Sequence, residues 1–244
     1  MDDWLLTSNQ YDLLFEGARI TLQILLYAFL LGVFLSLIFG VARLSERRWV
    51  RGGALVYVEV ARGISSIVLL FVIGIAIPIL LDVRQASLVL LAGIALGLNM
   101  GGYGAEIVRG SIQAIPKGQN EASIALNLSP TQRLRHVVLP QAMRIILPPM
   151  GNLTIEILKG TALVSLVGLR DIMGATRTIN NQRLTGSTAD ISVVFVNALV
   201  LYFIFAQIIN GLFRLGEWRL EKQYRGGDAE IEAAPHEPIP GVTK

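Results

Sequence analysis

The 244-residue sequence contains no cysteine, which excludes disulfide frameworks and thiolate metal sites. Its two histidines, His136 and His236, lack partner ligands at useful spacing, so we expect neither a metal site nor a catalytic histidine. The sequence also lacks a Walker-type glycine loop, so the chain is not expected to hydrolyse ATP itself. The formal net charge is only +3, and a nucleic acid is not an expected partner. We predict a protein without catalytic residues, metal or cofactor.

Charged residues are scarce as well. They make up 16% of the chain, against about 25% in soluble domains, whereas 53% of the residues are hydrophobic. The hydrophobic residues gather into five runs, each near the twenty residues that cross the hydrocarbon core of a bilayer. These runs are residues 20–41, 54–81, 86–107, 145–167 and 191–213. The sequence therefore predicts an all-α integral membrane protein with about five transmembrane helices.

The limits of the transmembrane domain follow from proline, glycine and composition. Pro148-Pro149 and Gly151 are expected to interrupt the fourth run near its start. The transmembrane domain is predicted to occupy residues 1–225. Residues 226–244 are rich in Gly, Glu, Ala and Pro without an apolar period, and we expect them to form a disordered tail.

The distribution of basic residues predicts the orientation in the membrane. Residues 1–18 contain no lysine or arginine, whereas basic clusters occur at 43–51, 117–144 and 214–225. With five spans, these clusters share one side, which the positive-inside rule makes cytoplasmic. The N-terminus is then outside and the C-terminus inside, and without a basic n-region the first span is not expected to be a cleaved signal peptide. The connection 168–190 is a partial exception with three arginines, and it is expected to lie along the outer surface.

A long polar connection, residues about 115–140, has its own helical pattern. Pro116 precedes a helix-forming run, and Asn127 stands where a residue with positive φ would end that helix. Ser129-Pro130 is a good N-cap and first-turn pair, so a second helix is expected to begin there. Leu139-Pro140 is expected to close it, because the residue before a proline avoids helical backbone angles. The first helix places three residues on one face: Ala122, Ala125 and Leu126. A docking surface for a cytoplasmic partner is the predicted role.

The same connection resembles the EAA loop of bacterial ABC-importer permeases. Glu121-Ala122-Ser123 matches the opening of the family pattern and Val138-Leu139-Pro140 its close, with Asn127 in place of the usual glycine. Residues 98–119 and 139–144 look like the flanking runs of polar amino-acid permeases. The resemblance implies a permease subunit in the bacterial cytoplasmic membrane, served by ABC ATPase subunits, an extracytoplasmic solute-binding protein and a second permease subunit. It assigns ATPase docking to Glu121, Ala122, Ser123, Ala125, Asn127, Leu139 and Pro140.

The pattern Glu-x-x-basic-Gly occurs three times within or near the apolar runs. The pairs are Glu59 with Arg62, Glu106 with Arg109, and Glu156 with Lys159. A spacing of three residues places each pair on one helix face, where opposite charges partly cancel. The pairs near span ends are expected to be structural, whereas the third, in mid-span, fits a structural role or a solute path equally well. The candidate pathway residues are Asn99, Asn152, Glu156, Lys159, Glu59 and Arg62.

Departures from the family pattern bear on the solute. Related permeases often read Lys-Asp-Thr-Ser where this chain reads Lys159-Gly160-Thr161-Ala162, and the lost carboxylate favours an unusual zwitterionic solute, such as one of the ectoine type. A secondary transporter or channel without an ATPase is the alternative, although it would not need the docking loop. A membrane scaffold would have the spans without the mid-membrane charge pairs. Gly102-Tyr103-Gly104 is expected to serve close helix packing rather than nucleotide binding.

Overall fold

The computed structural model describes residues 6–82, 86–183 and 191–232, and their regular structure is entirely helical. The α-helices are α1 (Ser8–Ala42), α2 (Arg48–Gly63), α3 (Ser66–Phe71), α4 (Ile77–Leu80), α5 (Leu88–Gln113), α6 (Lys117–Ala125), α7 (Pro130–Arg133), α8 (Leu139–Gly160), α9 (Ile172–Arg183) and α10 (Ile191–Glu232). Three further segments are π-helical η1 (Val72–Ala76) and η2 (Leu134–Val138), and 3-10 helical η3 (Thr161–Val167). The predicted all-α class is confirmed.

Four helical stretches in the described residues are long and apolar enough to cross a membrane. They are Ser8–Ala42, Leu88–Gln113, Pro130–Val167 and Ile191–Lys222. A bent pair, Arg48–Gly63 with Ser66–Leu80, supplies a fifth crossing if it is counted as one span. The expectation of about five spans agrees with this arrangement. The last helix, α10, continues to Glu232, past the residue at which the tail was predicted to begin, and residues 233–244 lie outside the described part of the chain.

The second apolar run, residues 54–81, is not the single straight span that we expected. Its two halves meet at an angle of 98°, with extended backbone at Ile64 and Ser65. The side-chain amide of Asn99 donates a hydrogen bond to the Ala61 carbonyl (2.9 Å) and accepts one from the Ser66 hydroxyl (3.1 Å). This buried amide therefore forms hydrogen bonds with polar groups on both sides of the break. Without these bonds, the polar groups would be costly to bury in a membrane.

Helix α8 passes through Pro148 and Pro149 without ending, so the predicted interruption of the fourth span is wrong. A proline removes a backbone hydrogen bond, and that loss motivated the prediction. Around the two prolines, Ile146, Met150 and Leu153 are buried in the main apolar core. We attribute the continuity of α8 to this packing, because neighbouring helices compensate for the lost bonds in membrane proteins.

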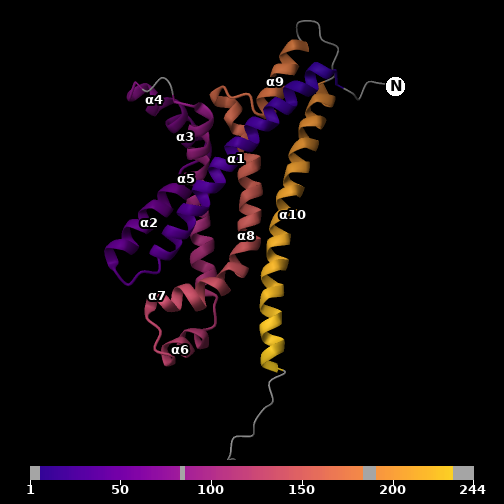
Figure 1. Cartoon of the computed structure of the whole chain (residues 1–244). Coiled ribbons are helices and arrows are strands. Elements are labelled where there is room, and N and C mark those ends of the chain that lie inside the picture. The colour runs from indigo at the N-terminus through magenta and orange to yellow at the C-terminus, as the bar shows by residue number, and fades with distance from the viewer. Residues whose placement is uncertain (1–5, 83–85, 184–190, 233–244) are drawn as a thin grey trace, which may run out of the picture.

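The most extensive helix contact joins α1 and α5, which cross near the centre of the molecule (Figure 1). A Cβ atom on Gly104 would overlap the Ser36 hydroxyl, and one on Gly102 would lie 2.7 Å from the Ala61 Cβ. Such close approach drives helix association in lipid, where the hydrophobic effect between helices is weak. The packing role expected for Gly102-Tyr103-Gly104 is therefore confirmed for both glycines. The small residues spaced along the crossing are Ala28, Gly32, Ser36 and Gly40 on α1, and Gly93, Gly97, Gly101 and Gly104 on α5.

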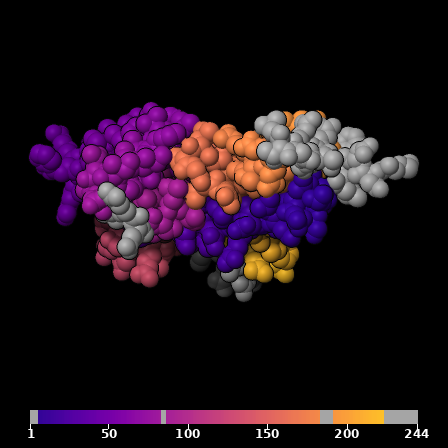
Figure 2. Space-filling view, turned by 90° about the horizontal axis from the view of Figure 1, so that it is seen from above, coloured from indigo at the N-terminus to yellow at the C-terminus, as the bar shows by residue number. Residues whose placement is uncertain are grey.

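The two ends of the molecule carry different elements. Helices α6 and α7 lie at the end to which α10 runs, and the start of α1 lies with α9 at the opposite end (Figure 1). Figure 2 looks onto that opposite end and shows the orange surface of α9 beside the indigo surface of α1. Helix α9 turns one face inward, since Ile172, Ala175, Thr176 and Ile179 are buried, whereas Arg177 is exposed, and the location predicted for residues 168–190, along the outer membrane surface, stays a prediction. The spacing of the four buried residues is that of one helix face, in a Thr/Asn-rich segment. Residues 184–190 lie outside the described part.

Candidate functional site

The connection between α5 and α8 folds as a short helix, a turn and a second short helix. Helix α6 ends before Asn127, whose φ of 56° is the left-handed value expected of it. Ser129 caps α7: its hydroxyl accepts the Gln132 N–H at 3.4 Å, and the Gln132 side chain accepts the Ser129 N–H at 3.0 Å. The predicted helix end at Asn127 and the predicted cap at Ser129 are both confirmed.

The close of this connection differs from the prediction. Leu139 has helical angles (φ −64°, ψ −42°) and Pro140 lies in the first turn of α8, so Leu139-Pro140 does not end a helix. The π-helical segment η2 explains this outcome. The Leu139 N–H bonds to the Leu134 carbonyl, five residues earlier, and this wider turn accommodates the proline ring. The consequence is a helical path that continues from the connection into the fourth span.

Helix α6 presents an exposed surface that includes large apolar side chains. Ile124 is 54% and Leu126 74% exposed, and exposed apolar groups beside polar ones are typical of protein contacts. The predicted docking residues that share this exposure are Glu121, Ala122, Ala125 and Asn127. Ser123 is buried instead, and its hydroxyl donates to the Asn120 carbonyl at 2.7 Å. Leu139 and Pro140 are half-buried at the junction with α8.

Two side-chain hydrogen bonds attach α6 to the helices that follow it. The Arg133 Nη1 donates to the Asn120 Oδ1 at 3.0 Å, and the Gln141 Nε2 donates to the Gln119 Oε1 at 3.1 Å. Each bond joins residues on different helices, and the second reaches the first turn of α8. The exposed surface of α6 is therefore mounted on the base of the fourth span.

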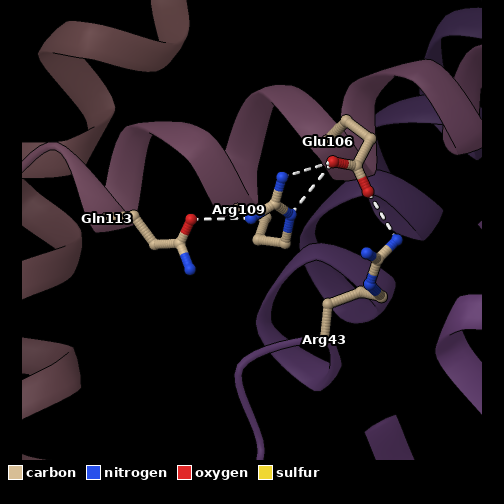
Figure 3. Close-up of polar contacts among 4 residues, drawn as sticks. All are labelled: Arg43, Glu106, Arg109 and Gln113. Atoms are coloured by element: carbon tan, nitrogen blue, oxygen red, sulfur yellow. Dashed lines mark hydrogen bonds and ion pairs between the residues drawn. The ribbon is translucent and has the colours of Figure 1, made fainter. Parts of the chain in front are cut away.

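Glu106 is the centre of a charged network at the same end of the molecule. Arg109, one turn later on α5, donates to the Glu106 Oε2 from Nη2 at 2.7 Å and from Nε at 2.9 Å (Figure 3). Arg43, at the end of α1, donates to the Glu106 Oε1, and the Arg109 Nη1 donates to the Gln113 Oε1 at 2.6 Å. The predicted Glu106–Arg109 pair is confirmed. The Arg43 contact was not predicted, because Arg43 entered the sequence argument only as part of a basic cluster.

Glu59 and Arg62 lie exposed on α2, and the described structure records no ion pair between them. The Arg62 guanidinium lies instead over the ring of Tyr103, 5.5 Å from its centroid, as a cation–π contact between α2 and α5. Asn99, another pathway candidate, is buried at the bend between α2 and α3, where its amide is engaged by Ala61 and Ser66. Glu59 and Arg62 thus lie on the first half of the broken span, and Asn99 bonds to Ala61, the residue before Arg62.

The remaining pathway candidates gather on one face of α8. Asn152, Glu156 and Lys159 are all exposed, and spacings of four and three residues align them. The residues between them turn inward: Leu153, Thr154, Ile157 and Leu158 are buried. The structure records no ion pair between Glu156 and Lys159 in the part of the chain that it describes. A polar stripe with one carboxylate and one ammonium group thus runs along the outside of the second half of α8.

Asp171 is a buried charged residue that the sequence argument missed. It precedes α9, and its carboxylate accepts hydrogen bonds from the Gly174 N–H (2.9 Å), the Met173 N–H (3.3 Å) and the Tyr202 hydroxyl (3.2 Å). Burial raises the pKa of the Asp171 carboxyl, although these three donors oppose the rise. The signal that could have found it is an Asp immediately before a helix whose apolar residues recur at helical spacing, the usual N-cap pattern.

Comparison with known protein families gives a match over most of the chain. Residues 29–221 match the model of the family described as "Binding-protein-dependent transport system inner membrane component". This range includes the connection α6–α7, the Glu106 network and the stripe on α8.

Individual relatives agree with this match. The chain is 41% identical, over 83% of its length and 84% of the relative, to a probable amino-acid ABC transporter permease of Sinorhizobium fredii. It is 34% identical, over 87% of the chain and 93% of the relative, to the histidine/lysine/arginine/ornithine transport system permease of Salmonella typhimurium. Among solved structures, a crystal structure of an amino acid ABC transporter with histidines superposes with a TM-score of 0.74 at 29% identity. The superposition covers 86% of this chain and 94% of that one.

Proposed function

The chain belongs to the family of binding-protein-dependent transport system inner membrane components, and we propose that α6 and α7 couple this permease subunit of a polar amino-acid ABC importer to its ATPase. The subunit is a non-catalytic, multi-pass protein of the inner membrane. A binding-protein-dependent ABC system also includes an ATPase and a solute-binding protein. The permease must therefore receive ATP-driven motion from one partner and solute from another.

The exposed surface of α6 carries the coupling proposal. Ile124 and Leu126 expose apolar side chains that a partner groove would cover, and Glu121 adds a charge at their edge. Small neighbours, Ala122 and Ala125, allow a groove to approach the helix closely. The hydrogen bonds from Arg133 and Gln141 attach α6 to α7 and α8, so a displacement of α6 would be passed on rather than absorbed.

Two connections would carry that displacement into the membrane. The first is the helical path from Pro130 through η2 into α8, which bears the polar stripe. The second is the Glu106 network, which ties α5, immediately before the docking connection, to Arg43 at the end of α1. Rigid-body motion of such connected helices is a common means of switching between inward-open and outward-open states.

The solute path, we propose, runs along the stripe formed by Asn152, Glu156 and Lys159. Unpaired charges facing lipid are costly, so this face requires water or protein beside it. A second permease subunit, identical or homologous, would place protein beside this face. A water-filled path would then be enclosed between the stripes of the two subunits. Zwitterionic solutes fit this stripe because they carry an ammonium group for Glu156 and a carboxylate for Lys159.

The proposed solutes are polar amino acids. One relative named above is a histidine/lysine/arginine/ornithine permease and another a probable amino-acid permease. The narrower prediction, an ectoine-type solute, follows only from Gly160 in place of the family aspartate, and neither relative carries that solute in its name. The proposed orientation has the N-terminus outside and the docking end in the cytoplasm, where an ATPase can reach α6.

The alternative function is that of a secondary transporter or channel. It gives the exposed surface of α6 no function, because no ATPase would bind there. It predicts uptake that follows an ion gradient and persists after ATP is removed. Proteoliposomes that contain the permease, its ATPase and its binding protein distinguish the two functions, because uptake by an importer requires ATP inside the vesicle.

Coupling is tested by changing α6 within that reconstituted importer. Ala125→Trp places a large ring where the partner must approach, and Glu121→Lys reverses a charge on the same surface. Both variants are expected to assemble in the membrane and to lose uptake at least about tenfold, which corresponds to a loss of about 1.4 kcal/mol of coupling. ATP hydrolysis should become independent of the solute-loaded binding protein.

Ala114→Trp is the matched control, since Ala114 is also exposed but lies before α6. It should retain coupled uptake. Normal uptake by both α6 variants, at wild-type abundance, would refute the docking assignment.

A further inference from the structure

A cavity of about 860 Å³ lies between the docking connection and the link that joins α1 to α2. Its wall includes apolar side chains from the ends of α1 and α5 and from η2, among them Val41, Ile112 and Leu134. Three basic residues also line it, namely Arg47, Lys117 and Arg133, against a single carboxylate, that of Glu46. The cavity thus combines an apolar wall with an excess of positive charge. The coupling role proposed above uses the bond between Arg133 and Asn120 in this wall but assigns no function to the cavity itself.

Arg133 is incompletely paired at this cavity. Its Nη1 donates to the Asn120 Oδ1, but its Nε is buried and has no hydrogen-bond partner among the described residues. A buried guanidinium N–H without an acceptor is costly, and the positive charge of this incompletely paired guanidinium at the cavity wall would attract an anionic oxygen. The chemistry of the lining therefore favours an anion as ligand.

The neighbouring part of α2 indicates where this anion comes from. Trp49 is 93% exposed in the first turn of α2, next to exposed Arg48 and Arg51. Exposed tryptophan beside basic residues at the end of a membrane helix is typical of the lipid headgroup layer. Basic pockets between helices at this level bind the headgroups of anionic lipids.

We propose that this cavity binds an anionic phospholipid, with the phosphate at Lys117 and Arg133 and an acyl chain along the apolar wall. The bound lipid would fill the space between the α1–α2 link and α7. It would thereby brace the docking connection against the membrane surface. An anionic headgroup would then be a structural part of the coupling end of the permease.

The test measures lipid retained by the full-length permease. Native mass spectrometry counts the phosphatidylglycerol that stays bound after purification, at increasing lipid concentration, with phosphatidylcholine as the zwitterionic comparison. Lys117→Gln and Arg133→Gln should each weaken phosphatidylglycerol binding about fivefold, since each basic residue contributes about 1 kcal/mol. Leu134→Trp narrows the cavity at its apolar wall without changing its charge. This variant should also retain less phosphatidylglycerol. Phosphatidylcholine binding should respond much less to the two charge changes.

Arg51→Gln is the matched control, because Arg51 is basic and exposed in the same region but does not line the cavity. It should bind phosphatidylglycerol as the wild type does, and an equal loss in this variant would overturn the proposal in favour of general surface attraction. Displacement of the lipid by inorganic phosphate alone would overturn the lipid assignment. Unchanged lipid retention together with lost ATPase binding in Arg133→Gln would assign the cavity rim to the ATPase contact instead. If Arg133→Gln does not fold, Lys117→Gln and Leu134→Trp decide the question.

Discussion

Arg43 at the end of α1 donates a hydrogen bond to the carboxylate of Glu106 on α5, 63 residues further along the chain. The contact closes the cytoplasm-facing end of the central helix pair, according to the proposed orientation. Both side chains are largely shielded from solvent, at 16% and 22% exposure. Arg109 binds the second oxygen of the same carboxylate, so one acidic side chain holds two basic ones.

Glu106→Gln should therefore destabilise the permease, because it leaves two guanidinium groups facing each other without a counter-charge. Hydrogen bonds to charged groups contribute about 1.5–3 kcal/mol, and we expect a loss within that range. Denaturant unfolding in detergent measures it, with exposed Glu16→Gln as the control. Combining Arg43→Met with Glu106→Gln should cost less than the sum of the two single changes. Strict additivity would show that the pair does not stabilise the fold.

The orientation can be tested with single cysteines, because the chain has none of its own. A cysteine at Ser8 should react with a membrane-impermeant reagent in intact cells, and one at Gly227 should react only after the cells are opened. The reason is the absence of basic residues before Arg19 and their abundance after the last span. The reverse labelling pattern would overturn the proposed topology.

Neutralising the stripe on α8 separates a pathway role from a structural one. If Glu156 and Lys159 border the solute path, the double change Glu156→Gln with Lys159→Gln should yield a folded permease with altered apparent affinity or selectivity. Each single change should impair transport more, since it leaves a net charge on the stripe, whereas the double change leaves none. Reconstituted uptake of zwitterionic and cationic amino acids is the measurement. Unchanged kinetics for every solute would exclude the stripe from the path.

Asp171 should make stability depend on pH. Its folded pKa is raised by burial, whereas an unfolded Asp titrates near about 3.9. The folded state then binds the proton more tightly than the unfolded state. The resulting stabilisation is complete at pH values below the pKa of the Asp171 carboxyl in the unfolded state. It is lost as the pH rises through the raised pKa of this carboxyl in the folded state. Thermal unfolding in detergent should show this loss in the wild type.

Asp171→Asn should flatten that part of the pH profile, because the amide does not titrate. Asp12→Asn is the matched control at an exposed aspartate, and its profile should resemble that of the wild type. A profile of Asp171→Asn with the same slope as the wild type would show that another group causes the pH dependence.

Much of the fold was predictable from local sequence. The apolar runs identified the four long spans, because the bilayer imposes a length of about twenty apolar residues on any crossing helix. The turn between α6 and α7 was predictable from the local preferences of two residues. Asn127 tolerates a positive φ and Ser129 can cap a helix, and both properties act within a few residues of the chain. The Glu106–Arg109 pair is also local, one helical turn apart.

What the tertiary structure decided involves residues far apart in the chain. The break at Ile64 and Ser65 is stabilised by hydrogen bonds of Asn99, which lies more than thirty residues away in the sequence. No pattern in residues 54–81 predicts that partner. Helix α8 continues through Pro148 and Pro149 because neighbouring helices pack around them. Glu106 meets Arg43 only because α1 and α5 cross closely. Sequence patterns of one or two turns report backbone preference and burial, whereas the choice of a distant partner depends on how the helices pack.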